Sequence, residues 1–94
     1  MRLLVITPKF RRAYRKFVKK SPKLQSHIDE LLRKMQTDVF LPDLGTHKLS
    51  GILSGLWACS CGYDCRIVFT LETDENTGNE VILLLDIRTH NEVY

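Results

Sequence analysis

Residues 80–94 constrain the fold of this chain most, because they join an apolar run to a polar tip. The run 81–85 is too short for an independent helix and rich in branched side chains, which is typical of a strand buried on both faces. The last seven positions then carry a crowded polar set: Arg88, Thr89, His90, Asn91, Glu92 and Tyr94. A rigid strand is a good support for a functional site, although an ordinary solvated terminus has the same polarity.

The length and composition fit one globular domain, which we expect to span residues 1–94. The chain is 44% hydrophobic and 27% charged, and its formal net charge of +3 is compatible with a nucleic-acid partner. The apolar run 3–6 is shorter than the ~7–15 residues of a signal-peptide core. No run approaches the ~20 apolar residues of a membrane span, so we expect a cytosolic protein with no membrane contact.

Three cysteines in an apparently cytosolic chain favour free thiols over a disulfide framework. Cys61 and Cys65 flank an expected hairpin turn, and together with Cys59 they could contribute to a metal site. Structural zinc usually takes four ligands that include a C-x₂-C spacing, and these cysteines lack that spacing. We therefore expect small buried thiols, no bound metal and no cofactor.

The N-terminal half shows the period of two amphipathic helices after a short strand at residues 3–6. Thr7 and Pro8 predict the start of the first helix, as an N-cap followed by a first-turn proline. Ser21 and Pro22 repeat this signal for a second helix, which should end near Thr37. With only one or two linking residues, the two helices should form an antiparallel hairpin. Most of the basic excess lies on the first helix, on a face that is either simply solvated or turned toward phosphate.

From Thr46 onward the pattern changes to the two-residue period of strands, at residues 46–50, 56–61, 65–71 and from 80 on. The element order β-α-α-β-β-β-β predicts an α+β fold. In this fold the helical hairpin packs on one face of a small, mainly antiparallel twisted sheet. Because two helices cover only one face, the other face is left for function.

Strand alternation predicts which side chains share each face of the sheet. On the helix side we expect Cys65, Ile67, Phe69, Leu83, Leu85 and Ile87. On the open side we expect Asp64, Arg66, Asp86, Arg88 and His90, with His47 and Lys48 joining from the rim. As an alternative, Asp86 only balances the charge of Arg66 or Arg88 within the sheet.

A cluster of cations and imidazoles on one face fits phosphodiester chemistry. Arginine and lysine stabilise the charge that grows on phosphate oxygens. Histidine, with an ordinary pKa of ~6.5, exchanges protons near neutral pH. The sequence shows no Asp and Glu cluster at metal-ligand spacing, so we expect chemistry that uses no metal.

Three motifs in this order resemble the RelE/ParE toxin superfamily, and its YafQ-like branch most. They are HKLSG at 47–51, DCRIVF at 64–69 and THNEVY at 89–94, and with the helical half the resemblance covers nearly the whole chain. The resemblance implies the toxin of a bacterial toxin–antitoxin pair, with an antitoxin as its partner. It also implies an endoribonuclease that cleaves mRNA on the ribosome.

The resemblance further implies roles for single residues. The expected catalytic residues are His47, Asp64, Arg66, His90 and Tyr94. The expected substrate-binding residues are Lys48, which matches a phosphate-binding position, and Arg88, which stands where many relatives have glycine. Ser60 departs from the YafQ-like pattern, which has a histidine there.

The same superfamily contains ParE-like members that inhibit DNA gyrase without cutting RNA. These members generally lack the histidine and tyrosine set, so the set favours the ribonuclease. The alternative function is therefore a non-catalytic gyrase inhibitor or a degenerate member that only binds its antitoxin.

Overall fold

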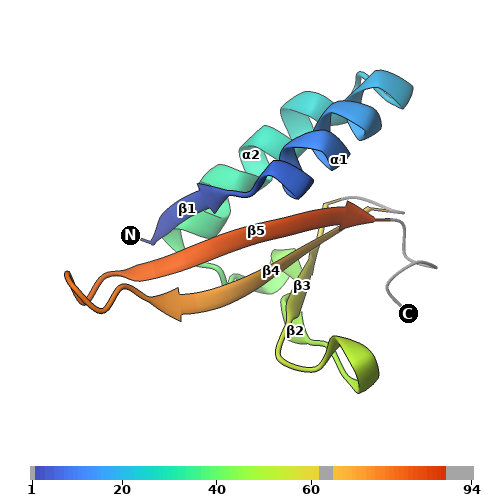
Figure 1. Cartoon of the computed structure of the whole chain (residues 1–94). Coiled ribbons are helices and arrows are strands. Elements are labelled where there is room, and N and C mark those ends of the chain that lie inside the picture. Colours follow the sequence, from blue (N-terminus) through green and yellow to red (C-terminus); the bar gives the residue numbers. More distant parts are fainter. Residues whose placement is uncertain (1, 62–64, 89–94) are drawn as a thin grey trace.

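The N-terminal half forms the predicted strand and helical hairpin. The computed structural model describes residues 2–61 and 65–88, and Figure 1 shows their arrangement. Strand β1 covers Leu3–Ile6, and helices α1 and α2 cover Pro8–Lys20 and Leu24–Thr37. Helix α1 begins as predicted, because the Phe10 N–H donates to Thr7 Oγ1 at 3.2 Å and Pro8 is the first helical residue.

Helix α2 begins later than the Ser21 and Pro22 signal predicts. Ser21 is instead the C-cap of α1, where its N–H donates to the Phe17 carbonyl at 3.0 Å. The chain then turns, and the Leu24 N–H donates to the Ser21 carbonyl at 2.9 Å as α2 starts. The predicted N-cap is wrong because Ser21 is already used to close the preceding helix.

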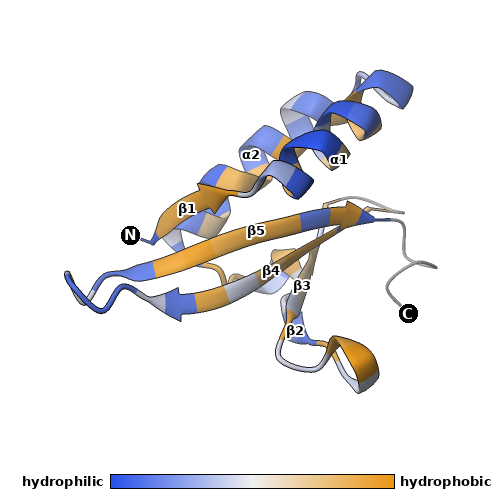
Figure 2. Ribbon diagram, in the orientation of Figure 1, coloured by the Kyte–Doolittle hydropathy of each residue, from blue (hydrophilic) through white to orange (hydrophobic). Residues whose placement is uncertain are grey.

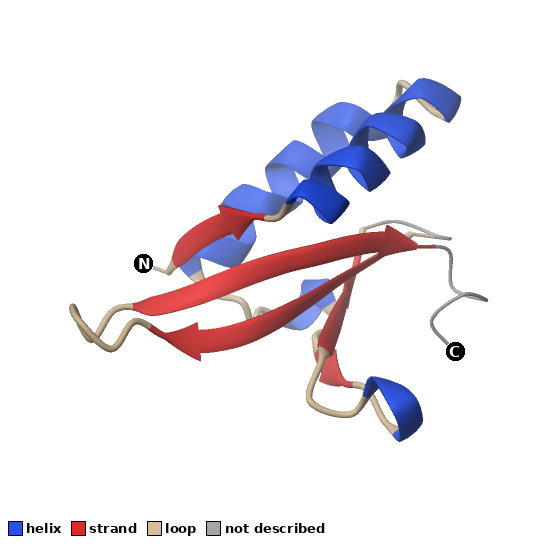
Figure 3. Ribbon diagram, viewed as in Figure 1, coloured by secondary structure: helices blue, strands red, loops and turns tan. Residues whose placement is uncertain are grey.

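The C-terminal half completes one five-stranded sheet in the order β1-β5-β4-β3-β2. The remaining elements are β2 (His47–Lys48), β3 (Trp57–Ser60), β4 (Arg66–Thr73), β5 (Glu80–Arg88) and the 3₁₀ turns η1 (Pro42–Leu44) and η2 (Gly51–Leu53). Strand β1 pairs parallel to β5, and the other neighbours are antiparallel. The α+β class and the element order are confirmed, with both helices on one side of the sheet (Figure 3).

The main core fills the space between the helices and one face of the sheet. Its fully buried side chains include Phe10, Ile28 and Met35 from the hairpin and Phe69 and Leu84 from the sheet. Hydrophobic colours run along β1 and β5, whereas α1 is mostly hydrophilic (Figure 2). In the parts of the chain that the structure describes, no helix has the length and apolarity to cross a membrane.

A bulge in β5 decides which of its residues face the core. Val68 pairs with Asp86, but Phe69 pairs with Leu84, so Leu85 is the extra residue. Past the bulge the alternation is shifted, and the buried helix-side residues of β5 are Ile82, Leu84 and Ile87. The predicted helix-side position is therefore confirmed for Ile87 but wrong for Leu83 and Leu85, which are not part of the main core, because a two-residue period does not reveal a bulge.

The open face is partly covered by a second, smaller apolar cluster. The segment 49–56 folds back on the sheet, and the Leu49 N–H donates to the Leu56 carbonyl at 2.9 Å. Gly51 and Gly55 permit this return, because their φ angles of 69° and 93° suit glycine best. Leu49 then packs with Ala58 and Val68. The part of the open face beyond this cluster is the end where β3 and β5 finish and β4 begins.

The bulge predicts that alanine substitutions at two adjacent leucines, Leu83 and Leu84, lower the stability of the protein by different amounts. Leu84→Ala should lower the free energy of unfolding by about 2–5 kcal/mol, because Leu84 is fully buried and its removal leaves a cavity. Leu83→Ala is the matched control and should cost clearly less, because Leu83 is only half-buried. Urea unfolding of both variants gives the comparison. Equal costs would contradict the described shift in alternation.

Candidate functional site

Three strand ends bring two arginines to one end of the open face. Ser60 at the end of β3 pairs with Arg66 at the start of β4, and Arg66 pairs with Arg88 at the end of β5. Residues that lie directly opposite each other in antiparallel strands share a face. This row of Ser60, Arg66 and Arg88, which we call the arginine row, confirms the predicted placement of both arginines on the open face.

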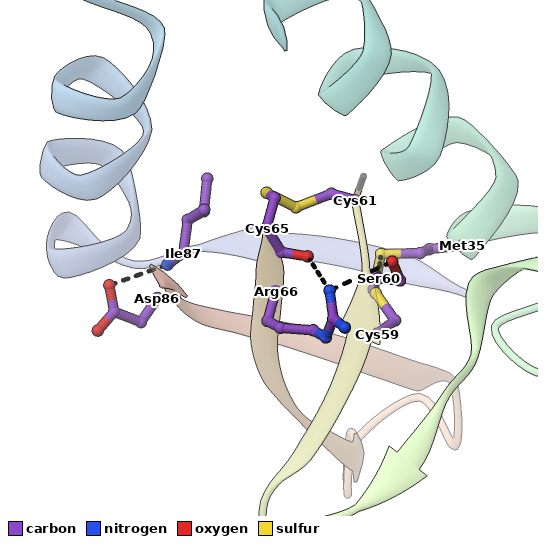
Figure 4. Close-up of a disulfide and its surroundings, with 8 residues drawn as sticks. All are labelled: Met35, Cys59, Ser60, Cys61, Cys65, Arg66, Asp86 and Ile87. Carbon is purple, nitrogen blue, oxygen red and sulfur yellow. Dashed lines mark hydrogen bonds between the residues drawn. A yellow bond between two sulfur atoms is a disulfide. The ribbon is translucent and has the colours of Figure 1, made fainter. Parts of the chain in front are cut away.

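The guanidinium of Arg66 is oriented by neighbouring oxygens (Figure 4). Its Nη1 donates to the Cys65 carbonyl at 2.9 Å and lies 3.4 Å from Ser60 Oγ. These two acceptors restrain the Nη1 end of the guanidinium on the open face. Sequence reasoning did not foresee this role for Ser60, although its place opposite Arg66 in the expected hairpin was the available signal.

The second arginine is paired with a nearly buried carboxylate. Arg88 Nε donates to Asp86 Oδ2 at 2.6 Å, and Lys9 Nζ of α1 lies 3.6 Å from the same oxygen. Asp86 Oδ1 also accepts the Ile87 N–H at 2.9 Å, and the residue is only 8% exposed. The interpretation of Asp86 as a charge-balancing residue is thus confirmed for Arg88, and Lys9 is a partner that the sequence did not suggest.

His47 lies on the same face as the arginine row, on the outermost strand. It pairs with Ala58, which pairs with Val68 of the open-face cluster. His47 Nδ1 lies 2.9 Å from the Gly45 carbonyl, and a carbonyl can only accept. Nδ1 is therefore the protonated nitrogen, and in the neutral ring Nε2 is the nitrogen able to take a proton.

The structure does not bring Lys48 to the arginine row. Lys48 pairs with Trp57, and adjacent residues in a strand point to opposite faces, so Lys48 lies on the other face from His47. Its Nζ lies 5.4 Å from the centre of the Trp57 ring, which packs against the main core. This contact has the distance of a cation–π interaction. We expected both His47 and Lys48 on the open face. This is confirmed for His47 and wrong for Lys48.

Three of the predicted catalytic residues lie outside the described part of the chain: Asp64, His90 and Tyr94. In sequence, Asp64 comes two residues before Arg66, and His90 comes two residues after Arg88. Their roles stay predictions.

The cysteines differ from the sequence prediction. Cys61 and Cys65 form a disulfide with a Cα–Cα distance of 5.0 Å, so the expectation of three thiols is wrong for this pair. The position of Cys61 and Cys65 on either side of a turn was the signal for a disulfide. The expected cytosolic location, where thiols are usually reduced, was given more weight in the prediction. Within residues 2–61 and 65–88, no group of three His, Cys, Asp or Glu side chains could hold a metal ion.

Cys59 is a buried free thiol, as expected. Burial raises its pKa to about 12, although the positive charge of Arg66 acts in the opposite direction. Its Sγ lies 3.8 Å from Met35 Sδ in the core. Because the thiolate is the reactive form, Cys59 should be inert in the folded protein.

These assignments predict how many cysteines react with iodoacetamide at pH 8. The folded protein should react at none, since Cys59 is buried and the other two are bonded to each other. Unfolding without reductant should expose one thiol, and unfolding with reductant should expose all three cysteines. Intact mass spectrometry counts the added groups. Three reactive thiols after unfolding without reductant would contradict the disulfide.

Neither a family model nor a curated protein matches this sequence. Solved structures do match over nearly the full length. The YoeB/ParE toxin from Agrobacterium tumefaciens is 18% identical, with a TM-score of 0.74 over 94% of this chain and 98% of that chain. YafQ from E. coli is 14% identical, with a TM-score of 0.72 over 100% and 99%.

A third similar structure is the toxin–antitoxin complex RelBE2 from Mycobacterium tuberculosis. Its matching chain is 13% identical, with a TM-score of 0.69 over 95% of this chain and 98% of that chain. Identities this low carry information about the fold. The chain therefore has the fold of the YoeB, YafQ and RelE toxins, as its resemblance to the RelE/ParE superfamily led us to expect.

Proposed function

We propose that this chain is the toxin of a toxin–antitoxin pair and that it cleaves mRNA as an endoribonuclease on the ribosome in the cytoplasm. The observation that carries the proposal is the arginine row at the open end of a toxin-like sheet, with the Arg66 guanidinium held in a defined orientation. Arginine is well suited to bind a phosphodiester, because its planar fork donates to two phosphate oxygens at once.

The proposed reaction uses the RNA as its own nucleophile. A general base, His47 Nε2 or Asp64, takes the proton of the 2′-hydroxyl, and this oxygen attacks the adjacent phosphorus. Arg66 stabilises the negative charge that grows on the non-bridging oxygens. His90 gives a proton to the departing 5′-oxygen, and Tyr94 stacks on or orients a base. The products are a 2′,3′-cyclic phosphate and a 5′-hydroxyl, and side chains supply all the charge and proton transfer.

The two arginines make different contributions in this proposal. The charge of Arg88 is offset by Asp86 at 2.6 Å, so Arg88 mainly shapes the end of the site. Arg66 Nη1 is oriented by a carbonyl and a hydroxyl. Because Arg66 is the central residue of the arginine row, between Ser60 and Arg88, we assign the main stabilisation of the transition state to Arg66.

Removal of the Arg66 guanidinium tests the proposal. Arg66→Ala should lower kcat for cleavage of ribosome-bound mRNA by about 10²–10³-fold, because an oriented donor to the developing charge is lost. Arg33→Ala is the matched control, since it removes the same charge from an exposed position on α2 and should leave kcat nearly unchanged. Thermal unfolding of both variants checks that the fold is retained.

Mapping of the RNA ends separates the proposed chemistry from its alternatives. Fragments with 2′,3′-cyclic phosphates are expected, and 3′-hydroxyl ends would rule out attack by the 2′-hydroxyl. Growth arrest with intact transcripts and an induced DNA-damage response would point instead to a gyrase inhibitor. Absence of both arrest and cleavage would point to a degenerate member that only binds its antitoxin.

The surface around β1 fits the proposed antitoxin partner. Strand β1 is at the edge of the sheet, and Leu3 and Ile6 are 58% and 47% exposed. An exposed apolar edge strand is a common site for another chain to bind. Beside it lies a groove of about 360 Å³, lined by Ile6, Phe10, Arg11, Tyr14, Arg15, Asp29 and Leu32.

The chemistry of this groove indicates the kind of segment it would take. Its floor is apolar, and Arg11 and Arg15 provide positive charge at its border. The one acidic group, Asp29, already accepts the Tyr14 hydroxyl at 2.8 Å. We therefore expect an antitoxin segment that combines apolar side chains with acidic ones. The solved RelBE2 structure is itself a toxin–antitoxin complex.

A charge placed in the groove tests the partner surface. Ile6→Asp should weaken binding of the proposed antitoxin by tenfold or more, because the complex would then bury a carboxylate on an apolar floor. Ile52→Asp is the matched control, since Ile52 is fully exposed on η2 and away from the groove. Calorimetric titration gives both affinities. Equal affinities for the two variants would place the antitoxin on another surface.

A further inference from the structure

The Cys61–Cys65 disulfide lies directly behind the arginine row. Both cysteines are part of the main core on the helix side, 0% and 2% exposed. Cys65 immediately precedes Arg66, whose side chain points to the opposite face of β4. One covalent bond on the core side therefore supports the residue that presents the phosphate-binding group on the other side (Figure 4).

The hydrogen bonds at this turn connect the disulfide to Arg66. The Cys65 carbonyl accepts the Cys61 N–H at 3.0 Å, which closes the hairpin, and also accepts Arg66 Nη1 at 2.9 Å. A second oxygen beside the guanidinium belongs to Ser60, the residue just before Cys61. These two oxygens thus come from a half-cystine and from the neighbour of one, so movement of the turn moves two groups that contact Arg66.

We propose that Cys61 and Cys65 form a reversible oxidation site whose disulfide form holds Arg66 in position for catalysis, and this role in catalysis rests on the proposed function. With the bridge closed, Cys61 and Cys65 cannot separate, and the Cys65 carbonyl stays beside the guanidinium. With the bridge open, the covalent restraint is lost, and the backbone hydrogen bond from the Cys61 N–H to the Cys65 carbonyl at 3.0 Å remains. Arg66 then samples more orientations and stabilises the transition state less well.

The redox step is a thiol–disulfide exchange with a dithiol. Because both sulfurs are buried, the exchange first needs a local opening that exposes one of them. One thiolate of the dithiol then attacks this sulfur, forms a mixed disulfide and releases the other protein sulfur as a thiolate, which takes up a proton. The second thiol of the reductant then attacks the mixed disulfide and releases the second protein thiol. Two electrons and two protons pass to the protein, and the dithiol becomes a disulfide. A small disulfide oxidant reverses the step.

Cys59 does not take part in this exchange and offers a matched control. It lies on β3 two residues from Cys61, but its Sγ is directed toward Met35 Sδ. The high pKa of its thiol keeps it protonated, so it does not compete as a nucleophile. Cys59→Ala removes a cysteine from the same strand and leaves the bridge intact.

The first experiment measures the oxidation state of the bridge and the environment of the Arg66 side chain, and it does not depend on RNA cleavage. The folded protein is treated with dithiothreitol and then with oxidised glutathione, and thiols are counted by alkylation and mass. The NMR resonance of the Arg66 Nε–H, identified by its loss in Arg66→Lys, is recorded in each state. We expect two new thiols in a protein that stays folded, a shifted and broadened Arg66 resonance, and full return on oxidation. Reduction only on unfolding, or an unchanged resonance, would overturn the proposal.

The second experiment measures cleavage in the two states. Reduction should lower kcat about 10- to 100-fold with little change in KM, because it disturbs the transition state more than binding. The Cys61→Ser/Cys65→Ser variant should match the reduced protein with or without dithiothreitol, and Cys59→Ala should respond like the unmodified chain. Equal kcat in both states would overturn the positioning role. If neither state cleaves RNA, the proposed function fails, and the resonance of Arg66 still decides whether the bridge positions it.

Discussion

The antiparallel pairing of β4 with β5 is the interaction on which the rest of the structure depends. It joins the two longest strands and places Phe69 beside Leu84 at the centre of the main core. Its bulge at Leu85 then shifts the alternation of β5 by one residue. Without this shift, Asp86 and Arg88 would face the core, where unsatisfied charge is costly. One local irregularity therefore permits a buried strand to end in a polar site.

The positive charge of the site depends on how each cation is held. Asp86 interacts with both Arg88 and Lys9, so it links the end of β5 to the first turn of α1. Ion pairs of this kind position side chains more reliably than they add stability. Arg66 lies opposite Arg88 and is held by a carbonyl and a hydroxyl. The geometry thus combines one arginine paired with a carboxylate and another whose guanidinium is oriented by a carbonyl and a hydroxyl.

Much of the fold could be predicted from the sequence because its signals are local. The Thr7 and Pro8 start of α1 and the helix-side positions of Cys65, Ile67 and Phe69 follow from capping and from strict alternation. The prediction was wrong where a residue has two competing roles or where the alternation breaks. Ser21 serves the end of α1, and the bulge moves Leu83 off the helix side.

The candidate site was predictable only in part, for the same reason. The register confirms that Arg66 and Arg88 share the open face. Arg66 follows from simple alternation along β4, whereas Arg88 reaches this face because the bulge shifts the alternation of β5. Lys48 was misplaced because His47 and Lys48 were treated as one motif, although neighbours in a strand point to opposite faces. The disulfide was missed because the reducing character of the expected cell compartment was weighed above the spacing of Cys61 and Cys65, which are four residues apart across an expected turn.

That disulfide explains how a small core can support a site at its border. Toward the open end of the sheet, the helix-side core consists of Cys61, Cys65, Ile67 and Ile87, which are smaller than the central Phe69. Small side chains bury less apolar area and therefore stabilise this end less. A covalent link between the residue after β3 and the residue before β4 restrains this end without needing more apolar volume. The same half-cystine, Cys65, therefore contributes its sulfur to the core and its carbonyl to the hydrogen bond with Arg66, so a change at the bridge should be measurable at the guanidinium.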